Sequence, residues 1–201
     1  MTTKPAFSRA EPDARRLSLI EACARVLASE GAAGTSVRAI ALAAGVSPGL
    51  VGHYFAGIDA LVAETYEHVE AQVCAAIDSA LDRAGTVPRA RLDACVTASF
   101  APPVARGELL STWIAFWSLV RARPAIARLH DEQYAQFRAR LEALLADCGL
   151  PPSRLRRAAI AITALVDGLW LELCLSPQAF SAEEARQISC TALDAVISTD
   201  R

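Results

Sequence analysis

Apolar residues recur along this chain at spacings of three and four residues, which is the period of an amphipathic α-helix. The first such segment is expected to begin near Asp13, a residue suited to an N-cap, and to end at Gly31. Its apolar face comprises Leu17, Ile20, Ala24 and Leu27. Runs that alternate apolar and polar residues, typical of strands, are absent from the sequence. The pattern therefore predicts an all-α protein of nine or ten helices.

Two short helices are predicted next, separated by a tight turn at Gly45. Thr35 or Ser36 is expected to cap the first of them. Ser47 is expected to cap the second, which covers 48–54 and begins with a proline whose missing N–H costs nothing there. The side chains expected to face the core are Val37, Ile40, Ala41, Leu50, Val51 and Phe55. Those expected on the outer face of the second helix are Gly49, Gly52 and His53.

Longer helices are predicted for the rest of the chain. One begins near Asp59 and runs to Arg83, and its buried stripe is expected to contain Leu61, Val62, Val69, Val73 and Ile77. Proline and glycine then delimit further helices at about 88–100, 104–122, 124–148, 152–175 and 181–198. The expected organisation is a three-helix head, residues 1–57, and a larger helical body, residues 58–201.

Charge and composition narrow the function classes. The formal net charge is −2, which by itself disfavours a nucleic-acid partner. Residues 1–55, however, carry six basic and four acidic side chains, so the head is mildly basic and the body acidic. The six cysteines have no zinc or disulfide-framework spacing. With no signal-peptide pattern and no apolar run of about 18 residues, we expect a soluble, cytoplasmic protein with no membrane partner.

The segment T-S-V-R-A-I-A-L-A-A-G-V-S-P-G-L-V, residues 35–51, has the features of a helix-turn-helix. Its alanines allow close helix approach, Gly45 makes the turn, and Val46 fills the space beneath it. Residues 46–61 nevertheless contain no Lys or Arg, and His53 is their single possible cation. From this segment alone, a DNA-binding motif and an ordinary Ala-rich helix pair both remain open.

The order of elements adds a resemblance. Residues 13–84 resemble the TetR family of bacterial repressors. The resemblance lies in the order of a helix, this motif and a long helix, and in the sequence VRAIALAAGVSPGLVGHYF. The resemblance implies a homodimer that places one head in each half-site of a double-stranded DNA operator and responds to a small-molecule effector. It implies DNA contacts from Arg16, Thr35, Ser36, Arg38, Ser47, Pro48, Gly49, Gly52, His53 and Tyr54.

Two further points concern the charge available to DNA. Arg9, Arg15 and Arg16 are expected to supply cations near the start of the chain, although a solvated terminus is the alternative interpretation. Ile58 departs from the resemblance, because family members usually carry a Lys three residues after the Phe. Its loss should remove about one phosphate contact.

The body carries a second resemblance. STWIAFWSLV, residues 111–120, and ALVDGLWLELCLSP, residues 164–177, are similar to the C-terminal domain of BetI-type members, repressors of glycine betaine synthesis from choline. Aromatic rings and a carboxylate suit a quaternary ammonium through cation–π attraction. The expected effector-binding residues are Glu67, Trp113, Phe116, Trp117, Tyr134, Asp167 and Trp170. The alternative is that the aromatic residues only fill the core.

The same resemblance places the subunit interface on the last two long helices, 152–175 and 181–198. The expected apolar face comprises Ala159, Ile162, Thr163, Val166, Leu169 and Trp170. The alternative is that this face fills the subunit's own core.

Other function classes find less support in the sequence. The three histidines lie in no catalytic or metal-binding motif, and no catalytic set, metal site or cofactor is expected. The alternatives that stay open are a helical interaction module without DNA binding and a TetR-like repressor with an unrelated apolar effector.

Overall fold

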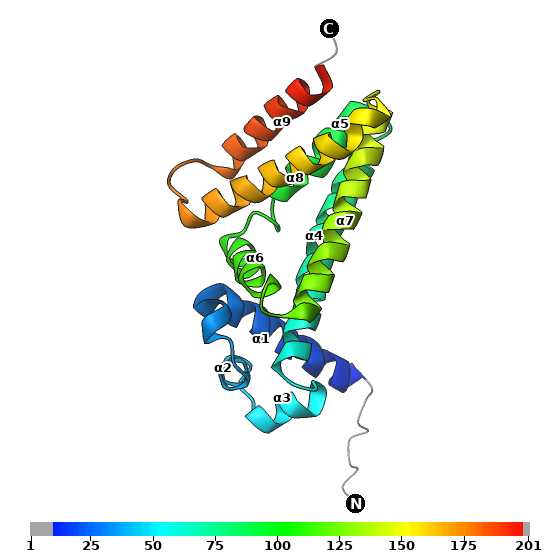
Figure 1. The fold of residues 1–201 in the computed structure, drawn as a ribbon. Helices are drawn as coiled ribbons and strands as arrows, with labels where there is room; N and C mark the ends of the chain where they lie inside the picture. The colour runs from blue at the N-terminus through cyan, green and yellow to red at the C-terminus, as the bar shows by residue number, and fades with distance from the viewer. Residues whose placement is uncertain (1–9, 199–201) are drawn as a thin grey trace, which may run out of the picture.

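The computed structural model describes residues 10–198, and this part of the chain folds into α-helices with one 3₁₀ turn and no strand (Figure 1). The all-α prediction is confirmed. The first three helices gather at one end of the molecule, and α4 leads from them along the body beside α7. The elements are α1 (Ala10–Gly34), α2 (Val37–Ala43), α3 (Pro48–Tyr54), α4 (Ile58–Arg83), α5 (Pro88–Thr97), η1 (Ala98–Phe100), α6 (Gly107–Val120), α7 (Pro124–Asp147), α8 (Pro152–Leu175) and α9 (Ala182–Ser198).

Helix α1 begins earlier than predicted. It starts at Ala10, so Asp13 lies within the helix and is not its N-cap. Pro12 is tolerated there because a residue in the first turn has no intrahelical partner for its N–H. Gly31, with φ of 65°, interrupts the helical backbone as expected, although one more turn follows it. Arg9, one of the predicted cations, lies outside the described residues.

The buried face of α1 agrees with the predicted one except at Leu17, since Ile20 and Leu27 are buried and Ala24 packs against the core. Leu17 was expected in the core, but it is 41% exposed. The buried stripe runs through Leu19, Cys23 and Val26. Leu17 is two residues from Leu19, a rotation of about 200° around the helix, so it points outward.

Helix α4 connects the head to the body, and its predicted stripe is confirmed. Leu61 and Val62, near the head, and Val69, Val73 and Ile77, along the body, are all buried in one continuous core. Helix α6 begins at Gly107, three residues later than predicted. The preceding backbone is used in turns, in which the Ala105 N–H donates to the Ala101 carbonyl at 3.1 Å.

All six cysteines are free thiols. Cys23 and Cys95 are buried, and burial raises the pKa of their thiols to about 11 and about 12. These two side chains therefore act as small apolar residues of the core.

Candidate DNA-binding surface and effector cavity

The turn between α2 and α3 follows from local residue chemistry. The Ser36 hydroxyl accepts a hydrogen bond from the Ala39 N–H at 3.2 Å and so caps α2. Gly45, with φ of 67°, makes the turn, in which the Val46 N–H donates to the Ala41 carbonyl. Helix α3 has the predicted bounds. Ser47 occupies its N-cap position but makes no side-chain capping hydrogen bond within the described residues.

Helix α3 presents a flat outer face. Gly49, Gly52 and His53 are exposed, as predicted. No other atom lies within 4 Å of the position that a β-carbon would take at either glycine. A rigid partner such as a DNA groove can therefore approach the backbone of α3 closely. The His53 ring contacts the Tyr54 ring edge-on, with centroids 5.2 Å apart.

The predicted phosphate-contacting residues divide by exposure. Ser36, Arg38, Ser47 and Pro48 are exposed, and Tyr54 is half-buried. Thr35 is buried, and its hydroxyl donates to the Gly31 carbonyl at 2.8 Å. Its one hydroxyl hydrogen is therefore used inside the fold, and Thr35 is less accessible than the other predicted contact residues.

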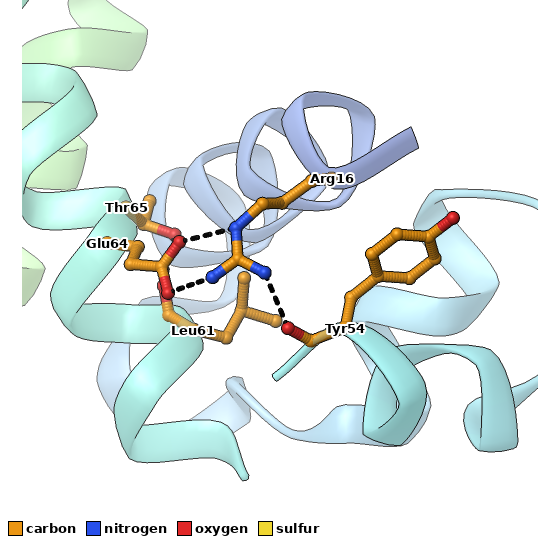
Figure 2. A network of polar contacts seen from close by, with 5 residues as sticks. All are labelled: Arg16, Tyr54, Leu61, Glu64 and Thr65. Atoms are coloured by element: carbon orange, nitrogen blue, oxygen red, sulfur yellow. Dashed lines mark hydrogen bonds and ion pairs between the residues drawn. The ribbon is translucent and has the colours of Figure 1, made fainter. Parts of the chain in front are cut away.

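Arg16, expected as a cation for DNA, makes contacts within the head that the sequence did not predict. Its guanidinium donates to both carboxylate oxygens of Glu64, at 2.9 and 2.5 Å, and to the Tyr54 carbonyl at 2.6 Å. It also covers the Phe55 ring, 4.4 Å from the centroid. Figure 2 shows the guanidinium between α4 and the end of α3. Arg15, one residue earlier, is exposed.

The start of α4 is held to both parts of the protein. Ile58 is half-buried and packs against the core. Asp59, which would oppose a phosphate, instead accepts a hydrogen bond from Arg123 at 2.5 Å, at the junction of α6 and α7. Its charge is therefore compensated by a cation of the body.

The body contains a cavity of about 100 Å³ between α4, α6, α7 and α8. Four of the predicted effector residues, Trp113, Tyr134, Asp167 and Trp170, line it together. The other lining residues are Glu70, Val73, Cys74, Ile77, Ser99, Gln133, Gln136, Phe137, Arg140, Thr163 and Val166. The fold thus brings together predicted residues as far apart in the sequence as Trp113 and Trp170, which are 57 positions apart.

The three remaining predicted effector residues do not line this cavity. Glu67 is exposed on α4, one turn nearer the head than the cavity reaches. Phe116 is fully buried and packs on Tyr66, with ring centroids 4.8 Å apart. Trp117 lines a separate, open hollow on the other side of Tyr134. Phe116 is therefore a core residue, as the alternative interpretation held.

A chain of polar contacts closes one side of the cavity. The Trp117 indole N–H donates to the Tyr134 hydroxyl at 3.1 Å, and that hydroxyl donates to the Asp167 carboxylate at 3.0 Å. Burial raises the pKa of the Asp167 carboxyl to about 6, against the lowering effects of Tyr134 and of the nearby Arg138 guanidinium. Burial also raises the pKa of Tyr134, so this hydroxyl remains a donor near neutral pH.

Aromatic rings line the same cavity as these polar groups. The Trp113 and Trp170 rings lie 6.1 Å apart, and the Trp170 indole N–H donates to the Ser99 carbonyl at 2.9 Å. Because its N–H is satisfied, Trp170 presents its apolar surface to the cavity without an unpaired polar group.

Sequence reasoning missed a second acidic residue at the cavity. Glu70 precedes Val73 and Ile77, which also line it, by three and seven residues, a spacing that places all three on one helical face. That periodicity was readable from the sequence, but the height along α4 at which the cavity lies was not. Glu70 also accepts a hydrogen bond from the Cys74 thiol at 3.2 Å.

The apolar face predicted for the subunit interface lies inside the subunit. Ala159, Ile162, Thr163, Val166 and Trp170 are buried, and Leu169 is half-buried. This face packs on α6 and α7 and lines the cavity, so the alternative interpretation was correct. The opposite face of α8 is exposed, and it carries small and apolar residues at spacings of three and four: Ala161, Ala164, Gly168, Leu171 and Leu175.

Helix α8 also corrects the expectation that no segment could span a membrane. An 18-residue window of it has a mean hydropathy of 1.8, which satisfies the length and composition of a span. Helix α8 packs on α6, α7 and α9, and it carries Asp167 in contact with α7. Its high hydropathy reflects apolar residues on both its inner and its outer face.

Comparison with known families matches both parts of the chain. Residues 19–65 match the family described as bacterial regulatory proteins, tetR family. Residues 88–198 match the family described as BetI-type transcriptional repressor, C-terminal. The two matches correspond to the head with the start of α4, and to α5 through α9.

Individual proteins resemble nearly the whole chain. An HTH-type transcriptional regulator BetI of Burkholderia thailandensis is 35% identical over 91% of this chain and 93% of its own length. The crystal structure of a transcriptional regulator from Pseudomonas aeruginosa PAO1 is 40% identical, with a TM-score of 0.85 over 96% of this chain and 95% of the other. A regulator from Saccharomonospora viridis, solved in complex with choline, shares the fold at 19% identity, with a TM-score of 0.78 over 90% of this chain and 96% of the other.

Proposed function

Because this chain belongs to the TetR family of DNA-binding transcriptional regulators and carries a BetI-type C-terminal domain, we propose that it is a homodimeric repressor controlled by a small organic cation. The family consists of regulators and not of enzymes. The observation that carries the proposal is the cavity of the body, which is lined by Trp113, Tyr134 and Trp170 together with Asp167. We place the protein in the cytoplasm, where its operator is accessible.

The chemistry of the cavity favours a quaternary ammonium ion. Such a cation donates no strong hydrogen bond, so it is held by aromatic faces and by unlike charge. Trp113, Trp170 and Tyr134 supply the faces, and Asp167 and Glu70 supply two acidic groups. Arg140 also lines the cavity, but its charge is paired with Asp78 at 2.8 Å. The choline complex of the Saccharomonospora viridis regulator, which has the same fold, supports this choice of ligand class.

The DNA-binding half of the proposal rests on the exposed side chains of the head. Ser36 and Arg38 on α2, and Ser47 and Tyr54 at the two ends of α3, are assigned to phosphates. Gly49, Gly52 and His53 are assigned to base edges in the major groove. One head would then occupy each half-site of a palindromic operator.

The dimer half rests on the outer face of α8. Leu171 and Leu175 are 37% and 65% exposed there, and Ile188 on the neighbouring α9 is 44% exposed. Small residues such as Ala164 and Gly168 lie between the two leucines and the start of the helix, and they would allow two helices to approach closely. A second copy of this chain, related by a twofold axis, would cover this face and leave the heads free for DNA.

Titration with choline and its uncharged carbon analogue, 3,3-dimethylbutanol, tests the effector. Choline should change the fluorescence of Trp113 and Trp170, raise the melting temperature and release DNA carrying the region upstream of the protein's own gene. The carbon analogue should bind more weakly because it lacks the charge. Asp167→Asn should reduce choline binding, whereas Glu132→Gln, an exposed acid on α7, should leave it unchanged.

Two outcomes would contradict parts of the proposal separately. Equal binding of choline and its carbon analogue would favour an apolar effector and leave the DNA-binding function intact. A wild-type protein that shifts no upstream DNA at low salt would contradict repression at that site, whichever ligand fills the cavity.

A further inference from the structure

We infer that Arg16 is a positioning residue for operator recognition: it holds the C-terminal end of α3 against α4 and does not contact phosphate. Figure 2 shows the contacts on which this rests. One guanidinium joins three helices, because Arg16 belongs to α1, Glu64 to α4 and Tyr54 to α3. The inference rests on the proposed operator binding, and it assigns a role to a pair of residues that are 48 positions apart.

The contact with Tyr54 satisfies a group that a short helix leaves open. The last carbonyls of a helix have no intrahelical partner, and a cation there also opposes the negative end of the helix dipole. Tyr54 is the last residue of α3, and its carbonyl accepts from Arg16 at 2.6 Å. At the other end, the Ser47 side chain makes no capping hydrogen bond to a described residue. The seven-residue helix α3 is therefore joined to α1 by the hydrogen bond that Arg16 donates to the Tyr54 carbonyl.

The same arginine fixes the direction of the chain that leaves α3. The guanidinium covers the Phe55 ring, which is 4% exposed. The Tyr54 ring points away from Arg16 in Figure 2. Arg16 therefore holds the backbone of Tyr54, while the Tyr54 ring remains available on the outer side of the head. Loss of the Arg16 contacts would let α3 tilt relative to α4, and Gly49, Gly52 and His53 would lose their common orientation toward the groove.

Glu64 competes with phosphate for the Arg16 guanidinium. Both carboxylate oxygens accept from the guanidinium, in the bidentate geometry that is the strongest arrangement for this pair. With the Tyr54 carbonyl, these contacts use three of the five guanidinium N–H donors, one on each nitrogen. The two charges cancel, so the pair contributes little to the long-range attraction of DNA.

The experiment measures binding to the upstream DNA as a function of salt for Arg16→Gln, Arg16→Lys and Glu64→Gln, with Arg15→Gln as the neighbouring arginine for comparison. If Arg16 is a positioning residue, Arg16→Gln and Glu64→Gln each weaken operator binding by about tenfold and leave the salt slope unchanged. Arg16→Lys fails to restore binding, because an ammonium group cannot reproduce the three-way planar contact.

The opposite results would overturn the inference. If Arg16 bound a phosphate, Arg16→Gln would lower the salt slope by about one unit, Arg16→Lys would restore binding, and Glu64→Gln would tighten it by releasing the cation. Glu64→Gln is the decisive variant, since removing an acid near DNA tightens binding unless positioning is lost.

Amide hydrogen exchange without DNA separates this inference from the proposed function. Arg16→Gln and Glu64→Gln should speed exchange of the Phe55 N–H, which donates to the Val51 carbonyl at the end of α3, and leave α8 unaffected. Unchanged exchange in both variants would contradict the inference itself. A wild-type protein that fails to bind the DNA would contradict the proposed function, and the exchange result would still decide the role of Arg16 in holding α3.

Discussion

In the head, the side chains assigned to DNA lie on the surface, whereas in the body those assigned to the effector surround a cavity of about 100 Å³. The head has few cations to offer, so one copy of it would bind DNA weakly, and the proposed dimer would gain affinity from two heads acting together. The proposed effector would be removed from water in the body, where Asp167 and Glu70 act in a medium in which charge interactions are strong. If the proposed function is correct, DNA is bound through two copies of an exposed surface, whereas the effector is bound through burial in one subunit.

The largest effect is expected when the proposed dimer is disrupted. Ala164→Glu places a charge on the exposed face of α8, where two copies of the same residue would meet across the twofold axis. We expect a monomer whose operator binding is weaker by about 10²–10⁴-fold, because the second head no longer binds at high effective concentration. Choline binding should persist, since Ala164 is exposed and does not line the cavity.

Sedimentation measures the oligomeric state, and gel-shift titration measures operator affinity. Ala135→Glu makes the same change on an exposed position of α7 and is the matched control. A dimeric Ala164→Glu variant with normal operator binding would show that the subunits meet on another surface.

The next largest effect is expected when a buried residue that lines the cavity is truncated. Trp170 is 6% exposed and its N–H is bound to the Ser99 carbonyl. Trp170→Ala should lower the free energy of unfolding by about 3–5 kcal/mol, because it leaves a large void and an unpaired carbonyl. Chemical denaturation measures this loss. Trp117→Ala, at a half-buried position outside the cavity, should cost clearly less; equal losses would contradict the central place of Trp170 in the body.

Burial of Asp167 should also make the stability of the body depend on pH. Burial raises the pKa of its carboxyl to about 6, above the ordinary value of about 4 in an unfolded chain. The folded protein binds this proton more tightly, so the contribution to stability is complete below pH about 4 and is lost as the pH rises through about 6. Asp167→Asn should therefore raise the free energy of unfolding at pH 7.5 by on the order of 2 kcal/mol. Denaturation at pH 7.5 and pH 4 tests this, since the gain should vanish at the lower pH.

The same carboxyl should make effector binding depend on pH. A cation binds the ionised form, so choline affinity should be constant well above pH 6 and fall by up to about tenfold per pH unit below it. Calorimetric titration between pH 5 and pH 8 measures the profile. The uncharged analogue should show a flat profile, as should Asp167→Asn; a wild-type profile without a step would assign the cation to Glu70 instead.

The smallest expected effect concerns the head alone. Ile58→Lys adds the cation that family members usually carry, at a half-buried position from which a long side chain can reach solvent. The salt slope of operator binding should steepen by about one unit, with tighter binding at low salt. Ile58→Met is the uncharged control. An unchanged slope would show that the start of α4 lies away from phosphate in the complex.

Elements governed by near neighbours were predictable from the sequence. The bounds of α3 were predicted as they occur, the cap of α2 was narrowed to Thr35 or Ser36, and the five residues of α4 predicted to be buried are buried. Each depends on interactions within about four residues, such as a hydroxyl that accepts from an N–H three positions on. The sequence left both Thr35 and Ser36 open as the cap, because two adjacent hydroxyls suit that position and only the backbone geometry selects Ser36.

The sequence by itself determined the helical fold, the helix-turn-helix and four of the side chains that line the cavity. The tertiary structure alone decided which face of α8 is interior, since the inner and outer stripes have the same period and both are apolar. It also decided that Arg16 is paired with Glu64, that Glu70 rather than Glu67 reaches the cavity, and that Phe116 belongs to the core. Helical periodicity specifies which residues share a face, whereas the partner of that face depends on how helices distant in the sequence pack together.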